Sequence, residues 1–312
     1  MTRPIVLALP GNESMAGRLG AALGWEIGVL ETRNFPDGET YLRFATDPKD
    51  RDVVLVCTLD RPDDKSLRLL LAADAARDLG ASKVGLVAPY LAYMRQDRRF
   101  QPGEAITSLT FARMVSAHFD WLATVDPHLH RYASLDELYD VPARAVRSAP
   151  LLSGWISANV SHPFLLGPDV ESEQWVSEVA GAIGAPWQVL RKTRYGDRNV
   201  EVAVPDLSIF AGHTPVIVDD IVSSGRTMAV TADQMREQGL ERPVLVAVHA
   251  LFSEETYRGL KERAAAVVSA NSVVHPSNAI DLSAVIADAV VELTEGDPII
   301  TSNKEANSNE RL

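Results

Sequence analysis

The chain has 312 residues, of which 46% are hydrophobic, and a formal net charge of −12. This composition supports one large domain or, more readily, two domains of ordinary size. The negative charge excludes nucleic acid and anionic membranes as expected partners, and it requires local positive charge wherever a phosphorylated ligand binds. A single cysteine, Cys57, excludes an intramolecular disulfide. No apolar run approaches membrane-spanning length, so we expect a cytoplasmic protein.

Short apolar runs alternate with longer amphipathic segments from the N-terminus onward. Buried strands are predicted at PIVLALP, DVVLVCTL, KVGLVAPYL, PFLLGP, TPVIVDD and PVLVAVHAL. Cys57 falls inside the second run and is predicted to be a small buried residue rather than a nucleophile. The segments SLRLLLAADAARDLG and TMAVTADQMREQG have apolar residues at helical spacing and end at a glycine. Apolar strands that alternate with helices are typical of parallel sheets covered on both faces, which indicates the α/β class.

Three segments of the first half have counterparts in the second half, in the same order and about 160 residues later. The three pairs are VLALPGNESMAGRLGAALG with FLLGPDVESEQWVSEVAGAIG, VLETRNFPDGETYLRF with VLRKTRYGDRNVEVAV, and VVLVCTLDRPDDKSLRLLLAADAARDLG with PVIVDDIVSSGRTMAVTADQMREQG. Both members of the second pair alternate around a polar turn, which predicts two hairpins. We therefore expect a duplication, with similar domains at residues 1–145 and 146–300. The polar tail, residues 301–312, is expected to be disordered.

The stretch VIVDDIVSSGRT, residues 216–227, combines an acidic pair with a loop of small residues before a predicted helix. Backbone N–H groups of such a loop, together with the helix dipole, favour a phosphate. Paired carboxylates accept hydrogen bonds from vicinal sugar hydroxyls. The stretch therefore predicts a site for a sugar phosphate, formed by Asp219, Asp220, Ser223, Ser224, Gly225, Arg226 and Thr227. A capped polar turn is the alternative, but it needs neither the acidic pair nor so many small residues in a row.

This stretch resembles the phosphoribosyl-diphosphate signature of the type I phosphoribosyltransferase fold. Together with NFPDGETYLRF, APYLAYMRQDRRFQPGEAITS, TVDPHLH, GPDVES and VLRKTRYGDRNVEV, it resembles the ribose-phosphate diphosphokinase family over nearly the whole chain. The resemblance implies two phosphoribosyltransferase-like domains, each a mainly parallel sheet flanked by helices. It implies transfer of the β,γ-diphosphoryl group of ATP to the 1-hydroxyl of ribose 5-phosphate. The products would be AMP and phosphoribosyl pyrophosphate for nucleotide biosynthesis.

The resemblance also assigns roles to single residues. Those implied in ATP binding are Phe35, Asp37, Glu39, Arg95, Gln96, Asp97 and His128. The loop of the first three would reach the adenine on a neighbouring subunit, which implies a homo-oligomer of at least two chains. His128 and Asp169 are the implied Mg²⁺ ligands, and Lys192 and Arg194 are the implied catalytic cations of a mobile hairpin.

Each of these residues also has an ordinary structural interpretation. Asp37 precedes a glycine, and this dipeptide is a strong hairpin-turn signal that is compatible with the nucleotide role. Asp169 suits a turn, and Lys192 and Arg194 suit the surface of a hairpin. His128 and His130 are expected on one face of a strand, where they resemble a zinc pair with no further ligand in view.

Three features depart from the family's usual pattern. Glu171 and Ser172 replace the glycine pair that usually follows this aspartate in the family. SSGRT replaces a Thr/Gly-rich loop, and VDPH replaces the commoner VDLH. These features are closer to the shorter, archaeal-type members, whose effector regulation differs. Two other functions fit these motifs less well. A phosphoribosyltransferase has no use for a duplicated domain with RQDR and FPDGE, and an inactive regulatory homologue is disfavoured because Lys192, Arg194 and His128 are all present.

Overall fold

The computed structural model describes residues 4–169, 172–195, 199–203 and 206–295. The first half alternates strands and helices and includes one hairpin. Its elements are β1 (Ile5–Ala8), α1 (Glu13–Leu23), β2 (Glu26–Ile27), β3 (Leu30–Asn34), β4 (Thr40–Phe44), β5 (Asp52–Val56), α2 (Pro62–Asp78), β6 (Lys83–Ala88), α3 (Thr107–His118), β7 (Trp121–Val125), η1 (Leu135–Glu137) and β8 (Ala143–Val146).

The second half has the same succession of elements. They are α4 (Ala149–Asn159), β9 (Pro163–Gly167), α5 (Glu173–Ile183), β10 (Trp187–Val189), β11 (Arg191–Tyr195), β12 (Asn199–Ala203), η3 (Ser208–Phe210), β13 (Thr214–Val222), α6 (Arg226–Glu237), β14 (Val244–Ala250), α7 (Glu254–Arg263), β15 (Ala266–Ala270), β16 (Asn278–Ile280) and α8 (Ser283–Glu295).

Two six-stranded sheets have one common plan. Their strand orders are β2-β1-β5-β6-β7-β8 and β10-β9-β13-β14-β15-β16, and neighbouring strands in both are parallel. Each half adds one antiparallel hairpin, β3–β4 or β11–β12. The predicted α/β class, the internal repeat and both hairpins are therefore confirmed. In the described ranges, every helix is too short or too polar to cross a membrane.

Burial explains why the apolar runs form these sheets. All seven residues of β14 and the last four of β5 are buried, because helices cover both faces of the sheets. Cys57 follows β5 directly and is only 1% exposed. Burial raises the pKa of its thiol to about 12, so the thiol is protonated at neutral pH and does not act as a nucleophile.

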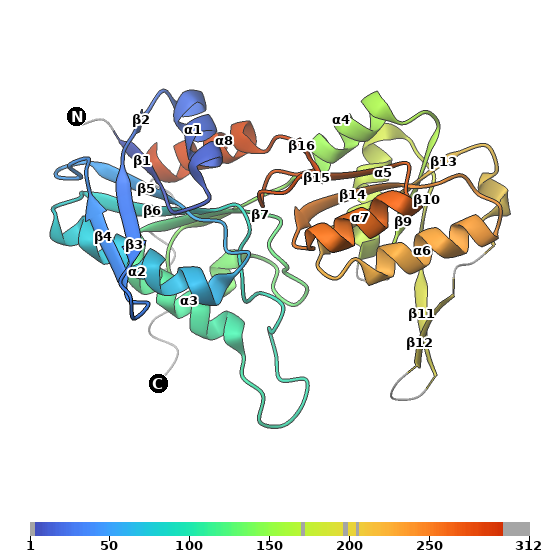
Figure 1. Cartoon of the computed structure of the whole chain (residues 1–312), viewed down its shortest axis with the longest axis horizontal. Helices are drawn as coiled ribbons and strands as arrows, with labels where there is room; N and C mark the ends of the chain where they lie inside the picture. The colour runs from blue at the N-terminus through green and yellow to red at the C-terminus, as the bar shows by residue number, and fades with distance from the viewer. Residues whose placement is uncertain (1–3, 170–171, 196–198, 204–205, 296–312) are drawn as a thin grey trace.

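The last helix, α8, returns to the first half of the chain. It packs on α1 and on the strands β7 and β8, and Figure 1 shows α8 in red beside α1 in blue. Its buried residues Ile286 and Val290 join the same apolar core as Trp121 and Val146. The predicted boundary after residue 145 lies within β8, and the division into residues 1–145 and 146–300 stays a prediction. Residues 301–312 lie outside the described ranges.

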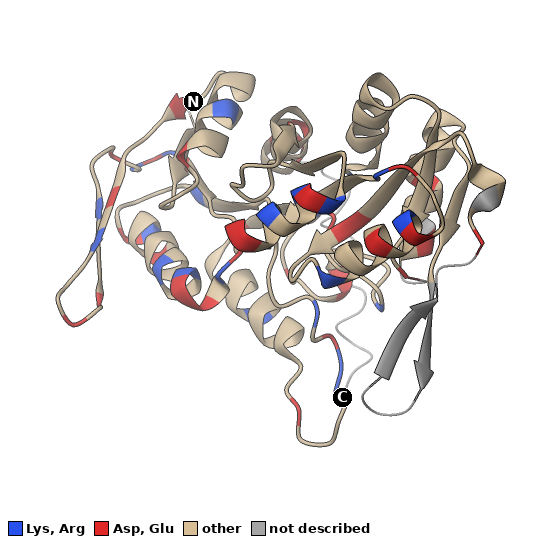
Figure 2. Cartoon of the chain, turned by 45° about the vertical axis from the view of Figure 1, so that its right-hand side comes forward, with Lys and Arg blue, Asp and Glu red and all other residues tan. Residues whose placement is uncertain are grey.

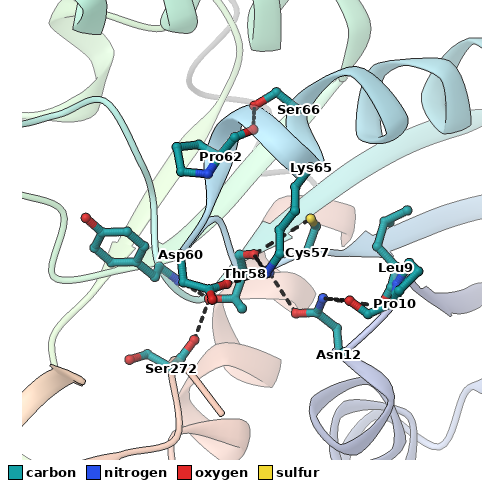
Figure 3. A network of polar contacts seen from close by, with 12 residues as sticks. Leu9, Pro10, Asn12, Cys57, Thr58, Asp60, Pro62, Lys65, Ser66 and Ser272 are labelled. Carbon is teal, nitrogen blue, oxygen red and sulfur yellow. Dashed lines mark hydrogen bonds and ion pairs between the residues drawn. The ribbon is translucent and has the colours of Figure 1, made fainter. Parts of the chain in front are cut away.

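A buried network of hydrogen bonds connects the two halves beside β5 (Figure 3). Thr58 Oγ1 donates to the carbonyl oxygen of Ser272 at 2.6 Å, across the interface between the halves. The Thr58 N–H donates to Asn12 Oδ1 at 2.7 Å, and the Tyr90 N–H donates to Thr58 Oγ1 at 3.2 Å. Asn12 and Thr58 are at most 5% exposed, so these bonds are shielded from water. They fix the orientation of the first sheet relative to the second.

Two glycines allow a direct test of the packing of the first sheet. A Cβ atom at Gly85 in β6 would lie 1.9 Å from Cε2 of Trp121, and Trp121 is only 2% exposed. Gly85→Ala should therefore lower the free energy of unfolding by about 1–3 kcal/mol, because the indole ring must shift in a close-packed core. Urea denaturation measures the change.

Gly154→Ala in the helix α4 is the matched control. A Cβ atom there has open space, so alanine should raise the free energy of unfolding by about 0.5–1 kcal/mol through its lower backbone entropy in the unfolded chain. Equal effects of the two substitutions would contradict the packing described for Gly85 and Trp121.

Candidate functional site

A cavity of about 590 Å³ opens where the carboxyl ends of strands from both sheets meet. Its walls come from the loop after β7, the end of β9, the last residues of β13 and the first turn of α6. Ligands commonly bind at this edge of parallel α/β sheets. The whole predicted sugar-phosphate set lines this cavity: Asp219, Asp220, Ser223, Ser224, Gly225, Arg226 and Thr227.

The acidic pair lies within β13 rather than after it, since the strand continues to Val222. Burial, together with the negative charges of Asp220 and Asp169, raises the pKa of Asp219 well above its usual value. Burial opposes ionisation of Asp220 too, but the interactions of its carboxylate with His128, with His249 and with the N–H of Ile221 together outweigh burial and lower the pKa to about 2. The pair therefore favours a single negative charge, located on Asp220.

His128 reaches the acidic pair from the other half of the chain. Its Nδ1 lies 3.2 Å from Asp220 Oδ2, and His130 Nε2 lies 3.0 Å from the same Nδ1. The prediction that these histidines share a face of a strand was wrong, because β7 ends at Val125 and Pro127 follows in the loop. Proline has no N–H to donate to a neighbouring strand, so the ladder stops before it.

Asp126 shapes the turn that carries these histidines. Its φ of 34° lies in the left-handed region, which is uncommon for a residue other than glycine. The carboxylate compensates by accepting hydrogen bonds from the N–H of Ser148, at 3.0 Å, and from its hydroxyl. Burial raises the pKa of Asp126 to about 6. A strained and partly desolvated aspartate at the cavity wall is a sign of a functional site.

The loop from Ser223 to Gly225 has the shape expected of an anion site. Gly225 has a φ of 66°, and α6 begins at the next residue, Arg226. A Cβ atom at Gly225 would lie 2.6 Å from Cγ2 of Thr256, so both the backbone conformation and the space require glycine. The N-terminus of α6 and the Arg226 side chain direct positive potential into the cavity.

The residues implied in nucleotide binding separate into three groups. Arg95 and His128 line the cavity, and so does the predicted metal ligand Asp169. Asp97 instead forms an ion pair with Arg131 at 3.2 Å and is 8% exposed, and the backbone oxygen of Gln96 accepts a hydrogen bond from the N–H of Ser108 in α3. These contacts tie the segment after Arg95 to α3 and to Arg131.

The remaining predicted residues lie on the two hairpins. Phe35, Asp37 and Glu39 occupy the turn of β3–β4, at the opposite end of the molecule from β11–β12 (Figure 1). Lys192 and Arg194 belong to β11, and their side chains lie outside what the structure describes.

The structure also describes one of the two residues that replace the family's usual glycine pair. Ser172 Oγ donates to the Asp169 carbonyl at 2.6 Å and tightens that turn. The other, Glu171, is outside the described ranges.

Four cavity or near-cavity residues were missed in the sequence. Arg147 and Trp175 line the cavity, and Asp126 forms part of its wall. His249 lies just behind: it is 1% exposed, and its imidazole hydrogen-bonds to Ser272 Oγ at 2.8 Å and to the backbone of Val125 and Asp126. A polar residue directly after an apolar run was the signal available for Arg147 and Asp126.

The donor chemistry of the cavity fits Mg²⁺. Carboxylates of Asp126, Asp169, Asp219 and Asp220 line one space, and oxygen atoms are the ligands that Mg²⁺ prefers. Arg95, Arg147 and Arg226 line the same space and supply positive charge for a polyphosphate, which the chain's net charge of −12 would otherwise repel.

Comparison with known proteins agrees with this arrangement. Residues 5–118 match the N-terminal domain of ribose phosphate pyrophosphokinase, and residues 134–283 match the phosphoribosyl transferase domain. The ribose-phosphate pyrophosphokinase of Methanopyrus kandleri is 34% identical over 93% of this chain and 99% of its own length. The chain belongs to the ribose-phosphate pyrophosphokinase family. This confirms the resemblance to the ribose-phosphate diphosphokinases, which is another name for the same enzymes.

Further relatives extend the match. The ribose-phosphate pyrophosphokinase of Thermoplasma acidophilum is 28% identical over 91% of this chain and 98% of its own length. Both relatives are archaeal, as the departures from the family's usual motifs predicted. The phosphoribosylpyrophosphate synthetase structure from Mycobacterium smegmatis has a TM-score of 0.81 and 22% identity, and the match covers 94% of this chain and 99% of that one. That similarity confirms the fold.

The pKa of His249 makes a prediction about stability. Burial lowers this pKa to about 4, so between about pH 6.5 and 4 the unfolded chain binds a proton that the folded chain does not. The free energy of unfolding should therefore fall by roughly 2 kcal/mol between pH 7 and 5 through this residue alone. His249→Gln should remove that fall, as measured by urea denaturation at each pH.

Measurements above pH 7 provide the control for this comparison of His249→Gln with the wild type. Above pH 7 the imidazole is neutral in both states, so the difference in unfolding free energy between His249→Gln and the wild type should stay constant there. Asp126 acts in the opposite direction, but it is present in both proteins. Equal slopes for the two proteins between pH 7 and 5 would contradict the buried neutral state of His249.

Proposed function

We propose that this member of the family transfers the β,γ-diphosphoryl group of ATP to the 1-hydroxyl of ribose 5-phosphate. One observation carries the proposal. A single cavity combines the phosphate loop and acidic pair of the second half with Arg95 and His128 of the first half. A sugar phosphate and a nucleoside triphosphate can therefore lie side by side, which is the condition for direct transfer between them.

The second half provides the sugar site in this proposal. The loop from Ser223 to Thr227 surrounds the 5-phosphate, with the N–H groups at the start of α6 and the Arg226 guanidinium as donors. Asp220 carries the negative charge of the acidic pair and accepts hydrogen bonds from the ribose hydroxyls. Asp219, whose pKa is raised, holds a proton that it can donate to a ribose oxygen. Together they fix the orientation of the 1-hydroxyl.

Both halves contribute to the nucleotide site. Arg95 of the first half and Arg147 of the second face the polyphosphate, and His128 and Asp169 would hold Mg²⁺ there. Bound Mg²⁺ supplies neutralisation of the phosphate charges. The sugar oxygen O1 attacks the β-phosphorus, a bond from O1 to phosphorus forms, and the bond to the α,β-bridging oxygen breaks to release AMP, while the hydroxyl proton is released to solvent. The protein contributes mainly positioning and charge stabilisation to this step.

The two hairpins have different roles in the proposal. β11–β12 brings Lys192 and Arg194 over the transferred group, where they stabilise the developing charge and exclude water. The β3–β4 turn with Phe35, Asp37 and Glu39 stands at the far end of the molecule from that hairpin (Figure 1). The family resemblance assigns this turn to the adenine bound by a second copy of the chain, and its distance from β11–β12 is compatible with that role. The working enzyme is then a homo-oligomer of at least two subunits.

The activity itself is the first test. Purified protein with ATP, ribose 5-phosphate and Mg²⁺ should give AMP and a sugar that carries a diphosphate at C1, both visible by phosphorus NMR. A spectrum that stays unchanged while either substrate binds would favour an inactive regulatory homologue. Consumption of phosphoribosyl pyrophosphate with a nucleobase, without synthesis from ATP, would favour a phosphoribosyltransferase.

Lys192→Ala tests the role of the β11 cations. Turnover should fall by orders of magnitude, because a charge that acts mainly in the transition state is lost, while the affinity for ribose 5-phosphate should change little. Isothermal titration measures that affinity separately from turnover. Arg191→Ala, the neighbouring cation to which no role is assigned, is the control and should keep most of the turnover. Near-normal turnover of Lys192→Ala would refute its catalytic role.

A further inference from the structure

Three metal-binding side chains converge at the wall of the cavity. His128 Nδ1 lies 3.2 Å from Asp220 Oδ2 and 3.0 Å from His130 Nε2, and each of the three residues offers a ligand atom within 4.8 Å of those of the other two. We infer that His128, His130 and Asp220 form a site for a borderline divalent transition-metal ion such as Zn²⁺ or Co²⁺. Its two imidazole donors differ from the carboxylate oxygens that line the same cavity, and it shares His128 with the Mg²⁺ site proposed above.

Proton counting favours an ion at this point. His128 Nδ1 faces two acceptors at once, a carboxylate oxygen and the other imidazole nitrogen, and it can carry only one hydrogen. A proton on His130 Nε2 instead would leave the lone pair of Nδ1 pointing at the Asp220 carboxylate. One metal ion accepts all three lone pairs.

The distances agree with a tetrahedral ion. Zinc–nitrogen and zinc–oxygen bonds of about 2.0–2.1 Å place neighbouring ligand atoms roughly 3.3 Å apart. The two observed separations of 3.0 and 3.2 Å are close to that value. The imidazole rings are nearly perpendicular, with an interplanar angle of 80°, so the two nitrogens approach from different directions. Three protein ligands leave a fourth position open to the cavity.

The nature of the donors selects the ion. Two imidazoles and one carboxylate are a donor set typical of zinc, cobalt and nickel, whereas Mg²⁺ prefers oxygen alone. The site is accessible to ions, because the His128 and Asp220 side chains are 20% and 29% exposed and His130 lies at the surface. His130 is the residue that completes the set. His130 follows His128 by two residues in the loop after Pro127, where the chain has left the sheet. This position brings the two imidazole rings together.

Occupancy of this site has a consequence that rests on the proposed function. An ion bound to Asp220 removes the carboxylate that we assign to the ribose hydroxyls. It also takes His128 away from the nucleotide side. The ion should therefore inhibit in competition with ribose 5-phosphate, even when Mg²⁺ is in large excess.

Direct binding is tested first, without reference to activity. Full-length protein without a histidine tag, titrated with Co²⁺, should show the visible absorption bands of a tetrahedral ion at one equivalent per chain, and Zn²⁺ should displace them. His130→Asn should weaken Co²⁺ binding at least roughly 100-fold, since even loss of an outer-shell partner costs 10–100-fold. His118→Asn, at the remote end of α3, is the matched control and should bind as the wild type does.

Two results of this titration would overturn the site. One is the absence of tetrahedral Co²⁺ bands from the wild type, which would reduce the cluster to a hydrogen-bonded pair of rings. The other is equal Co²⁺ affinity of the wild type and His130→Asn.

Inhibition is tested second. With each variant normalised to its own rate in Mg²⁺ alone, Zn²⁺ should raise the KM for ribose 5-phosphate in the wild type and in His118→Asn, but not in His130→Asn. Equal inhibition of all three would overturn the competition. A protein that shows Co²⁺ bands but makes no phosphoribosyl pyrophosphate would refute the proposed function and leave the metal site standing.

Discussion

The contact between His128 and Asp220 is the constraint on which the rest of the site depends. These residues are 92 positions apart and belong to different halves of the chain, yet their side chains meet at 3.2 Å. Such a contact exists only if the two halves keep one relative orientation. The Thr58–Ser272 bond and the buried His249 ring fix that orientation from behind the cavity. The polar interface is therefore as much a part of the site as the cavity wall.

Electrostatics resolves an apparent conflict between an acidic chain and phosphorylated ligands. Acidic and basic side chains are interspersed over the helices (Figure 2), while Arg95, Arg147 and Arg226 gather around one cavity. The surroundings of the two adjacent carboxylates change their pKa values and reduce the negative charge that they carry together. The pKa of Asp219 is raised and that of Asp220 is lowered, so two adjacent acids do not present two full charges to a phosphate. Local arrangement thus outweighs net charge at short range.

Features encoded in a few consecutive residues could be predicted from the sequence. The buried strands, both hairpins and the loop before α6 follow from local patterns, and the repeat follows from their order. The partners across the interface could not be predicted, because the proximity of Arg147 and His249 to the site depends on how the sheets pack. The prediction of a strand through His128 was wrong because it relied on the apolar pattern before this residue and gave too little weight to Pro127, which ends the strand. The apolar face of α8 predicts burial but does not specify which sheet it covers.

The return of α8 to the first sheet has a consequence for how the protein is made. Residues 283–295 are synthesised after both sheets, yet they cover α1, β7 and β8, which emerge long before. The nascent first half therefore keeps an apolar surface exposed until α8 has been synthesised. Contacts between residues so distant in the chain slow folding and lengthen the time during which incomplete chains can aggregate. A premature stop before α8 would thus damage the half of the protein that had already been synthesised in full.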